Sequence, residues 1–237
     1  MKNARKHNWS DRAYRTRHEG GTTMKHKILT LVCAAMLAGS LSYAAEPAVV
    51  GTAPASVYTQ ADGSRLTLQL PDITISTNPA AAQKINAYFA KEAASTKAFF
   101  DKQQGNGSVM SEDKSYEVTL NDGTYLSLVE TGHIRFEKEA HPTYWKTGVT
   151  FDLATGEVLN WQDLVKPEDA KAFTLKNINR ALLLSKYHLS GYFTGLTELP
   201  KNFYLDKNRG IHFIFGLYEV APYSTGIVDL DMMKDAK

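Results

Sequence analysis

Two stretches of alternating apolar and polar residues, each interrupted by turn residues, constrain the fold most. In the first, apolar and polar residues alternate over residues 116–120, and the turn residues Asn121-Asp122-Gly123 follow. A second strand-like run covers residues 125–129. Asp-Gly between two alternating runs is a strong short-range signal for a β-hairpin. Strand-like runs continue as far as Leu159. The sequence therefore predicts an antiparallel meander in this region.

The second stretch runs from Phe203 to Asp231 and contains two strand-like runs around the turn residues 208–210. A corner at residues 218–226 follows and leads into a last strand. Pro222 has no backbone N–H to give to a strand ladder, so regular pairing should break at this corner. We expect the corner to be either a folding device or a binding edge.

Two helices complete the predicted fold. Asn78 and Pro79 are typical of a helix start, and apolar residues at helical spacing extend this helix over about residues 78–103. A second helix is expected from the acidic start at residues 167–169 to about Lys186. Two helices beside groups of hairpins indicate an α+β protein.

The N-terminal region has the pattern of a secretory signal. Basic residues follow Met24, then an apolar run covers residues 28–41, and small residues end at Ala44. The apolar run, about fourteen residues, is shorter than the roughly 20 needed to cross a bilayer. We expect cleavage after Ala44 and export to the periplasm or the cell surface. Either Met24 is the true start, or residues 1–23 precede an uncleaved membrane anchor.

Removal of this leader changes the charge of the chain. Residues 45–237 contain 19 basic and 23 acidic residues, so the basic excess belongs to the leader. This balance gives no support to nucleic-acid binding, and a mildly acidic domain favours a basic partner. Cys33, the one cysteine, lies in the leader, so the exported chain has neither a disulfide nor a thiolate metal site.

The expected organisation is a leader over residues 1–44 and a linker over residues 45–56. An N-terminal α+β half then covers residues 57–164, and a C-terminal α+β half covers residues 165–237. Each half contains one helix and one group of hairpins.

Several short motifs carry a family resemblance. They are Leu126-Ser127-Leu128, Ala140-His141-Pro142, the run from Phe151 to Leu159, Asp163-Leu164, and the corner Tyr218-Glu219-Val220-Ala221-Pro222-Tyr223-Ser224-Thr225-Gly226. With these motifs the chain resembles the RsiV-like extracytoplasmic domain family. The similarity spans roughly residues 56–231. The resemblance implies an exported or membrane-anchored bacterial envelope protein. Some such domains are attached to anti-sigma factors that sense lysozyme, some precede peptidoglycan deacetylase domains, and many stand alone.

Two departures limit what the resemblance implies. Lys138 and Glu139 stand where the family often has two glycines. Neither a sigma-binding region nor a deacetylase domain is evident, so neither activity is carried over. The implied function is a binding module for a lysozyme-like muramidase or for peptidoglycan.

The histidines of the exported chain do not have the spacing of a metal site. They are His133, His141, His188 and His212. No His-Glu-x-x-His pattern occurs, so we expect neither a metal nor a cofactor. His141 is the best candidate of the four, because His-Pro in a loop presents a polar ring at an irregular position. His212 alternates with apolar residues and should lie on the polar side of its strand.

The corner supplies the remaining candidate binding residues, Tyr218, Glu219 and Tyr223. Glu219 lies between apolar neighbours and is expected to be partly buried, where it would anchor the corner. The pair Asp229 and Asp231 is interpreted as a solvated strand edge.

No nucleophile elbow or comparable catalytic motif occurs. The sequence therefore favours a non-enzymatic exported binding module. The alternatives are an envelope glycan hydrolase or deacetylase, with His141 and Glu219 as its candidate residues, and a structural envelope module.

Overall fold

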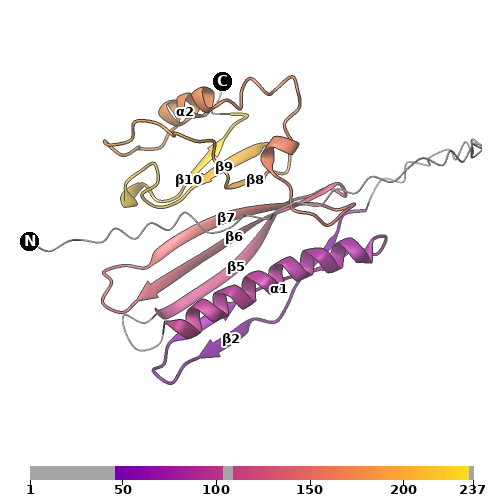
Figure 1. The fold of residues 1–237 in the computed structure, drawn as a ribbon, viewed down its shortest axis with the longest axis vertical. Helices are drawn as coiled ribbons and strands as arrows, with labels where there is room; N and C mark the ends of the chain where they lie inside the picture. Colours follow the sequence, from indigo (N-terminus) through magenta and orange to yellow (C-terminus); the bar gives the residue numbers. More distant parts are fainter. Residues whose placement is uncertain (1–45, 104–108, 235–237) are drawn as a thin grey trace, which may run out of the picture. The chain divides into compact units, whose positions relative to one another are not determined.

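The computed structural model describes residues 46–103 and 109–234 and confirms the predicted α+β class (Figure 1). The predicted signal sequence and Cys33 lie outside the described residues. Within those residues, no helix has the length and apolarity needed to cross a membrane.

Five strands form the larger sheet in the order β2-β3-β5-β6-β7. The meander predicted from the Asp-Gly turn is β5, β6 and β7, and its pairing is antiparallel. β3 runs parallel to β5, so the sheet as a whole is mixed. The strand bounds are Ser56–Thr59 for β2, Arg65–Leu68 for β3, Val109–Asn121 for β5, Tyr125–Phe136 for β6 and Thr143–Asp152 for β7.

Helix α1 (Pro79–Lys102) covers one face of this sheet and confirms the first predicted helix. The side chain of Asn78 caps its start by accepting a hydrogen bond from the N–H of Ala81 at 3.2 Å. Phe89 is buried and packs edge-on against Phe151, with ring centroids 5.6 Å apart. Such aromatic pairs contribute about 1 kcal/mol beyond the area they bury.

Three strands form the smaller sheet in the order β10-β9-β8, with bounds Val228–Asp231, Ile211–Phe215 and Phe203–Leu205. The predicted hairpin is β8 and β9, and β10 adds antiparallel to β9. Helix α2 (Leu175–Leu184) packs on this sheet through Ile178 and Leu182. In Figure 1 the layers follow one another as α2, smaller sheet, larger sheet and α1.

Helix α2 is shorter than the sequence predicts. Residues 167–173 form turns, and the helix begins only after Thr174, whose side chain accepts a hydrogen bond from the N–H of Asn177 at 3.3 Å. The acidic residues at 167–169 therefore begin a series of turns that precedes the helix.

The stretch expected as a linker, residues 45–56, contains a strand. β1 (Val49–Thr52) pairs antiparallel with β4 (Pro71–Thr74). Ala48 is buried just before it, and both of its backbone groups bond the side chain of Asn121, at 2.9 and 2.6 Å. The composition of this stretch suggested a linker. A strand was not predicted, because the partners of β1 and Ala48 lie far away in the sequence.

The smaller sheet approaches the larger one through the backbone of β8. A Cβ atom at Gly148 would overlap the carbonyl group of Phe203, so only glycine permits this contact. The Asn202 side chain accepts a hydrogen bond from the Gly148 N–H and donates one to the Lys146 carbonyl, each at 2.9 Å. Ser127, fully buried, accepts a hydrogen bond from the Leu205 N–H at 2.9 Å.

Asn86, Asn121 and Asn179 complete backbone hydrogen bonds in the same way as Asn202. Each accepts from a backbone N–H and donates to a backbone carbonyl, as a neighbouring strand would. The pairs are Asn86 with Ile73, Asn121 with Ala48, Asn179 with Leu196, and Asn202 with Gly148 and Lys146. A buried backbone group left without a partner is costly, so these side chains stabilise loops and strand edges whose backbone groups face no further strand.

One face of the smaller sheet carries a hydrogen-bonded network of Tyr204, His212 and Asp229. Nδ1 of His212 lies 2.8 Å from one carboxylate oxygen of Asp229, and the Tyr204 hydroxyl donates to the other at 2.9 Å. His212 lies on the polar side of its strand, as predicted. Asp229 was interpreted as part of a solvated edge, but it is half-buried and bonded because β8 and β9 place two polar rings opposite it.

The network shifts the pKa of all three members. Burial, with the charge and hydrogen bond of Asp229, raises the pKa of the Tyr204 hydroxyl. Burial acts to lower the pKa of His212, but the hydrogen bond and charge of Asp229, with the charges of Asp231 and Asp206, outweigh it and raise the pKa. Burial acts to raise the pKa of Asp229, yet the hydrogen bonds from His212 and Tyr204 lower it.

We predict that Gly148→Ala destabilises the fold by about 3 kcal/mol, because the added methyl group displaces the β8 backbone. Urea unfolding of both proteins measures this change. Gly191→Ala is the matched control, since a Cβ there meets no atom within 4 Å. Equal midpoints for the two variants would show that β8 does not approach the larger sheet this closely.

We also predict that the His212 ring titrates above 6.5, the ordinary pKa of histidine, and that Asp229→Asn lowers this pKa. The raised pKa stabilises the fold fully below pH 6.5, and this contribution is lost as the pH rises through the folded pKa. The lowered pKa of Asp229 stabilises the fold fully above about 3.8, and this contribution is lost as the pH falls through the folded value.

NMR titration of the histidine ring protons gives these pKa values. Asp113→Asn is the control, because Asp113 lies 3.3 Å from His133 and is not part of the network. An unchanged His212 titration in Asp229→Asn would contradict the assignment.

Candidate functional site

The loop between β6 and β7 meets the corner that follows β9. The rings of His141 and Tyr223 are stacked, with centroids 4.0 Å apart and planes 29° from parallel. The Tyr223 hydroxyl donates a hydrogen bond to the Pro142 carbonyl at 3.1 Å, across 81 residues of sequence. The fold thus brings together two of the residues that the sequence singled out separately.

Tyr218 places a third ring beside this stack, tilted 33° to the ring of Tyr223. Its centroid lies 5.8 Å from that of Tyr223, and its side chain is 66% exposed. Its backbone has φ +65°, a left-handed conformation that is strained for a bulky residue. Val220 and Ala221 are buried in the core of the smaller sheet and so anchor the corner. We call His141, Tyr223 and Tyr218 the aromatic row.

Glu219 differs from the prediction that it is partly buried. It is exposed, and one of its carboxylate oxygens accepts a hydrogen bond from the Gly216 N–H at 2.8 Å. The side chain closes the turn that follows β9, so its contact within the corner is structural. Burial was expected from the apolar Val220 beside it, but in the turn Val220 points inward and Glu219 outward.

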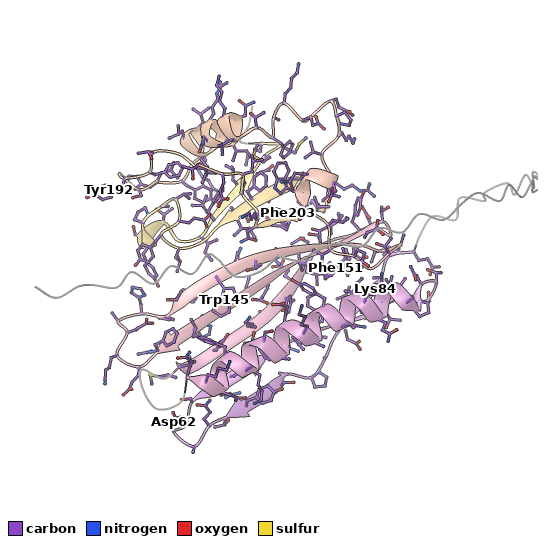
Figure 2. The ribbon with its side chains drawn as sticks, in the orientation of Figure 1. Asp62, Lys84, Trp145, Phe151, Tyr192 and Phe203 are labelled. Carbon is purple, nitrogen blue, oxygen red and sulfur yellow. The ribbon has the colours of Figure 1, made fainter. Side chains whose placement is uncertain are left out.

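A cavity of about 540 Å³ lies beside Tyr218 and Glu219. Its other walls come from the loop of residues 190–202 and from Phe215. Tyr192 belongs to this loop and is 96% exposed. Figure 2 labels it at the edge of the molecule. The cavity volume lies within the range of about 300–1,000 Å³ that is typical of ligand sites.

Hydrogen bonds from surrounding elements hold this loop. Leu196 bonds the side chain of Asn179 on α2, at 2.6 and 3.1 Å. The Trp161 indole N–H donates to the Pro200 carbonyl at 2.8 Å, and the Ser190 N–H donates to the Val220 carbonyl at 3.0 Å. A loop held at several points presents its exposed side chains with little ordering left to do on binding.

The sequence analysis assigned no candidate residue between positions 189 and 200, so it did not identify Tyr192 or the cavity. The signal available in the sequence was the combination of tyrosine and phenylalanine with two glycines in a long irregular stretch, which is typical of functional loops.

A second polar cluster lies between α1 and the larger sheet, and the sequence analysis missed it. Glu130 accepts hydrogen bonds from the Tyr116 hydroxyl at 2.6 Å and from the Trp145 indole N–H at 2.7 Å, with the Lys114 ammonium at 3.4 Å. Figure 2 labels Trp145 at this place. The sequence signal for this cluster was Glu130, two residues after Leu128. Residues two apart in a strand point to the same face, so Glu130 shares the face of Leu128.

The same interface contains Glu112, which is 4% exposed. Burial raises its pKa, and the nearby Lys114 opposes the shift. Burial and the charge of Glu130 also raise the pKa of Tyr116. Tyr116, Trp145 and Lys114 all contact the carboxylate of Glu130. We therefore interpret the cluster as a network that stabilises the interior.

Neither the aromatic row nor the cluster around Glu130 includes, among the described residues, a set of side chains placed to bind a metal ion. Within residues 46–103 and 109–234, no three His, Cys, Asp or Glu side chains lie close enough to hold a metal ion. Nδ1 of His141 lies 3.3 Å from the Pro142 carbonyl, so this polar contact of the ring is with a backbone group. The aromatic row and its cavity are therefore suited to recognition by stacking and apolar contact.

Comparison with solved structures shows the same fold in two bacterial proteins. A DUF3298 family member from Bacteroides fragilis has a TM-score of 0.55 at 19% identity, covering 78% of this chain and 89% of that one. A DUF3298 family protein from Pseudomonas aeruginosa PAO1 has a TM-score of 0.52 at 15% identity, covering 80% and 92%.

No curated protein matches the sequence. The family model described as "Protein of unknown function (DUF3298)" matches residues 72–234, which include β5, β6 and β7 of the larger sheet, the aromatic row and the smaller sheet. The chain belongs to the DUF3298 family.

Proposed function

We propose that this protein is an exported, non-enzymatic module of the bacterial envelope that binds a protein partner through the aromatic row and the cavity beside it. The observation that carries the proposal is the ring stack of His141 and Tyr223, which joins two distant segments at the surface. Export rests on the basic, apolar and small-residue pattern between Met24 and Ala44.

Exposed aromatic side chains favour binding. Tyr218 and Tyr192 are 66% and 96% exposed. Tyrosine is enriched at the centres of protein interfaces because it offers a large rigid surface with a polar tip. The left-handed backbone at Tyr218 is a strained feature of a kind that clusters at functional sites. One carboxylate oxygen of Glu219 accepts a hydrogen bond from the Gly216 N–H, which is a structural contact within the turn.

The partner we propose is a lysozyme-like muramidase. The resemblance of the corner to RsiV-like domains supports this choice. The acidic balance of residues 45–237, 23 acidic against 19 basic residues, suits a basic partner. The cavity beside Tyr218 supplies a recess for one of the partner's side chains. Peptidoglycan is the alternative ligand that the resemblance implies.

We predict that Tyr218→Ala and His141→Ala each weaken binding of purified lysozyme about 10-fold or more, since each removes an exposed ring from the row. Isothermal titration calorimetry with the full chain measures the affinity, and circular dichroism checks that the fold persists. Phe99→Ala is the matched control, because this aromatic side chain is 42% exposed but lies on α1.

Sedimentation with insoluble peptidoglycan separates the two ligands. Binding to peptidoglycan that depends on Tyr218, without binding to lysozyme, would replace the muramidase by the glycan as the ligand of the same site. Binding to neither, or equal loss in Phe99→Ala, would remove the proposal.

A further inference from the structure

Helix α2 has an outward face made of two leucines and two basic residues. Ile178, Ala181 and Leu182 are buried against the smaller sheet. The exposed residues of the helix are Lys176, Arg180, Leu183 and Leu184. Their spacing of four, seven and eight positions from Lys176 places all four on one face of a helix.

The two leucines are unusually exposed. Leu183 is 68% and Leu184 is 64% exposed, whereas most leucines of this fold belong to its cores. They are adjacent at the end of the helix, so they form one small apolar patch with water on its outer side. Isolated exposed apolar residues need no explanation, but a patch of this kind beside basic groups matches a recognised interaction surface.

The charge around this patch is of one sign. No aspartate or glutamate occurs between residues 170 and 188, a stretch with four Lys and Arg residues. Among the described residues, none of these four cations forms an ion pair with a carboxylate. Glu198, on the loop that contacts α2, is instead 3.5 Å from Lys201. This basic region contrasts with the acidic excess of residues 45–237 as a whole.

We propose that this face of α2 lies on an anionic phospholipid surface. Lysine and arginine attract lipid phosphates and anionic headgroups, while leucine enters the boundary between headgroups and acyl chains. The acidic remainder of the chain is repelled by the same surface, so the charge asymmetry selects α2 as the side that faces lipid. A second copy of this face is a poor partner, because it would bring like charges together.

This inference does not rest on the aromatic row. It needs only that the protein meets a membrane surface, and its readout is local to α2. Binding of lysozyme and contact of α2 with lipid are therefore tested separately, and failure of one leaves the other standing.

The test places an environment-sensitive fluorophore at the end of α2. Leu184→Cys in a Cys33→Ser background is labelled with NBD, and the full chain is mixed with vesicles of phosphatidylglycerol and phosphatidylcholine. Because the probe reports on its own surroundings, contact made by the N-terminal segment alone does not move it. The same label at Val158→Cys is the control, since Val158 is 48% exposed and lies outside α2.

We expect a blue shift of the NBD emission at position 184 with anionic vesicles and none with pure phosphatidylcholine. Lys176→Gln together with Arg180→Gln should raise the lipid concentration at the midpoint about 10-fold or more, because each basic residue near the surface contributes to attraction. Lys91→Gln with Lys102→Gln, two exposed lysines of α1, should leave it unchanged.

Three results would overturn the proposal. The first is no shift of the emission at position 184 with anionic vesicles, and the second is an equal shift at position 158. A shift that grows with protein concentration and without vesicles would identify a second copy as the occupant.

Discussion

The contact between the β8 backbone and Gly148 is the constraint on which the rest of the structure depends. A side chain at position 148 would overlap the carbonyl group of Phe203, so the approach is possible only with glycine. Asn202 then supplies the hydrogen bonds that β7 lacks at this edge, and the buried Ser127 bonds the N–H of Leu205. With β8 held in this way, the corner after β9 reaches the loop that carries His141.

The same chemistry connects the scaffold to the surface we propose as functional. Asn179 bonds both backbone groups of Leu196, and so attaches the cavity loop to α2 as Asn202 attaches β8 to β7. An asparagine side chain has one acceptor and two donors, so it can replace a short piece of a neighbouring strand. The irregular segments of this protein are thus positioned by specific side chains, which is why exposed residues such as Tyr192 have a defined place.

Local patterns in the sequence were sufficient for the elements that depend on neighbours in sequence. The Asp-Gly turn between β5 and β6, the hairpin of β8 and β9, and the Asn78 cap of α1 were all predicted, because turn and cap chemistry is local. Helix α2 begins later than expected, since an acidic start alone does not distinguish a helix from a series of turns. β1 was taken for a linker because its partners are far away in sequence.

The candidate site was predictable in its parts but not in its assembly. His141 stood out by its loop, and Tyr218 and Tyr223 by the corner, yet their stacking depends on how two sheets meet. Asp229 looked like a solvated edge because the sequence does not show that Tyr204 and His212 lie opposite it. Such non-local contacts carry no periodic signal along the chain.

Hydrogen exchange of the Asn202→Ala variant tests the central claim most directly. If Asn202 holds β8 against β7, exchange should accelerate at the Gly148 amide and in residues 137–142 and 216–226, with α1 unchanged. Wild-type exchange in the two segments would contradict the claim that β8 docking holds the aromatic row in place.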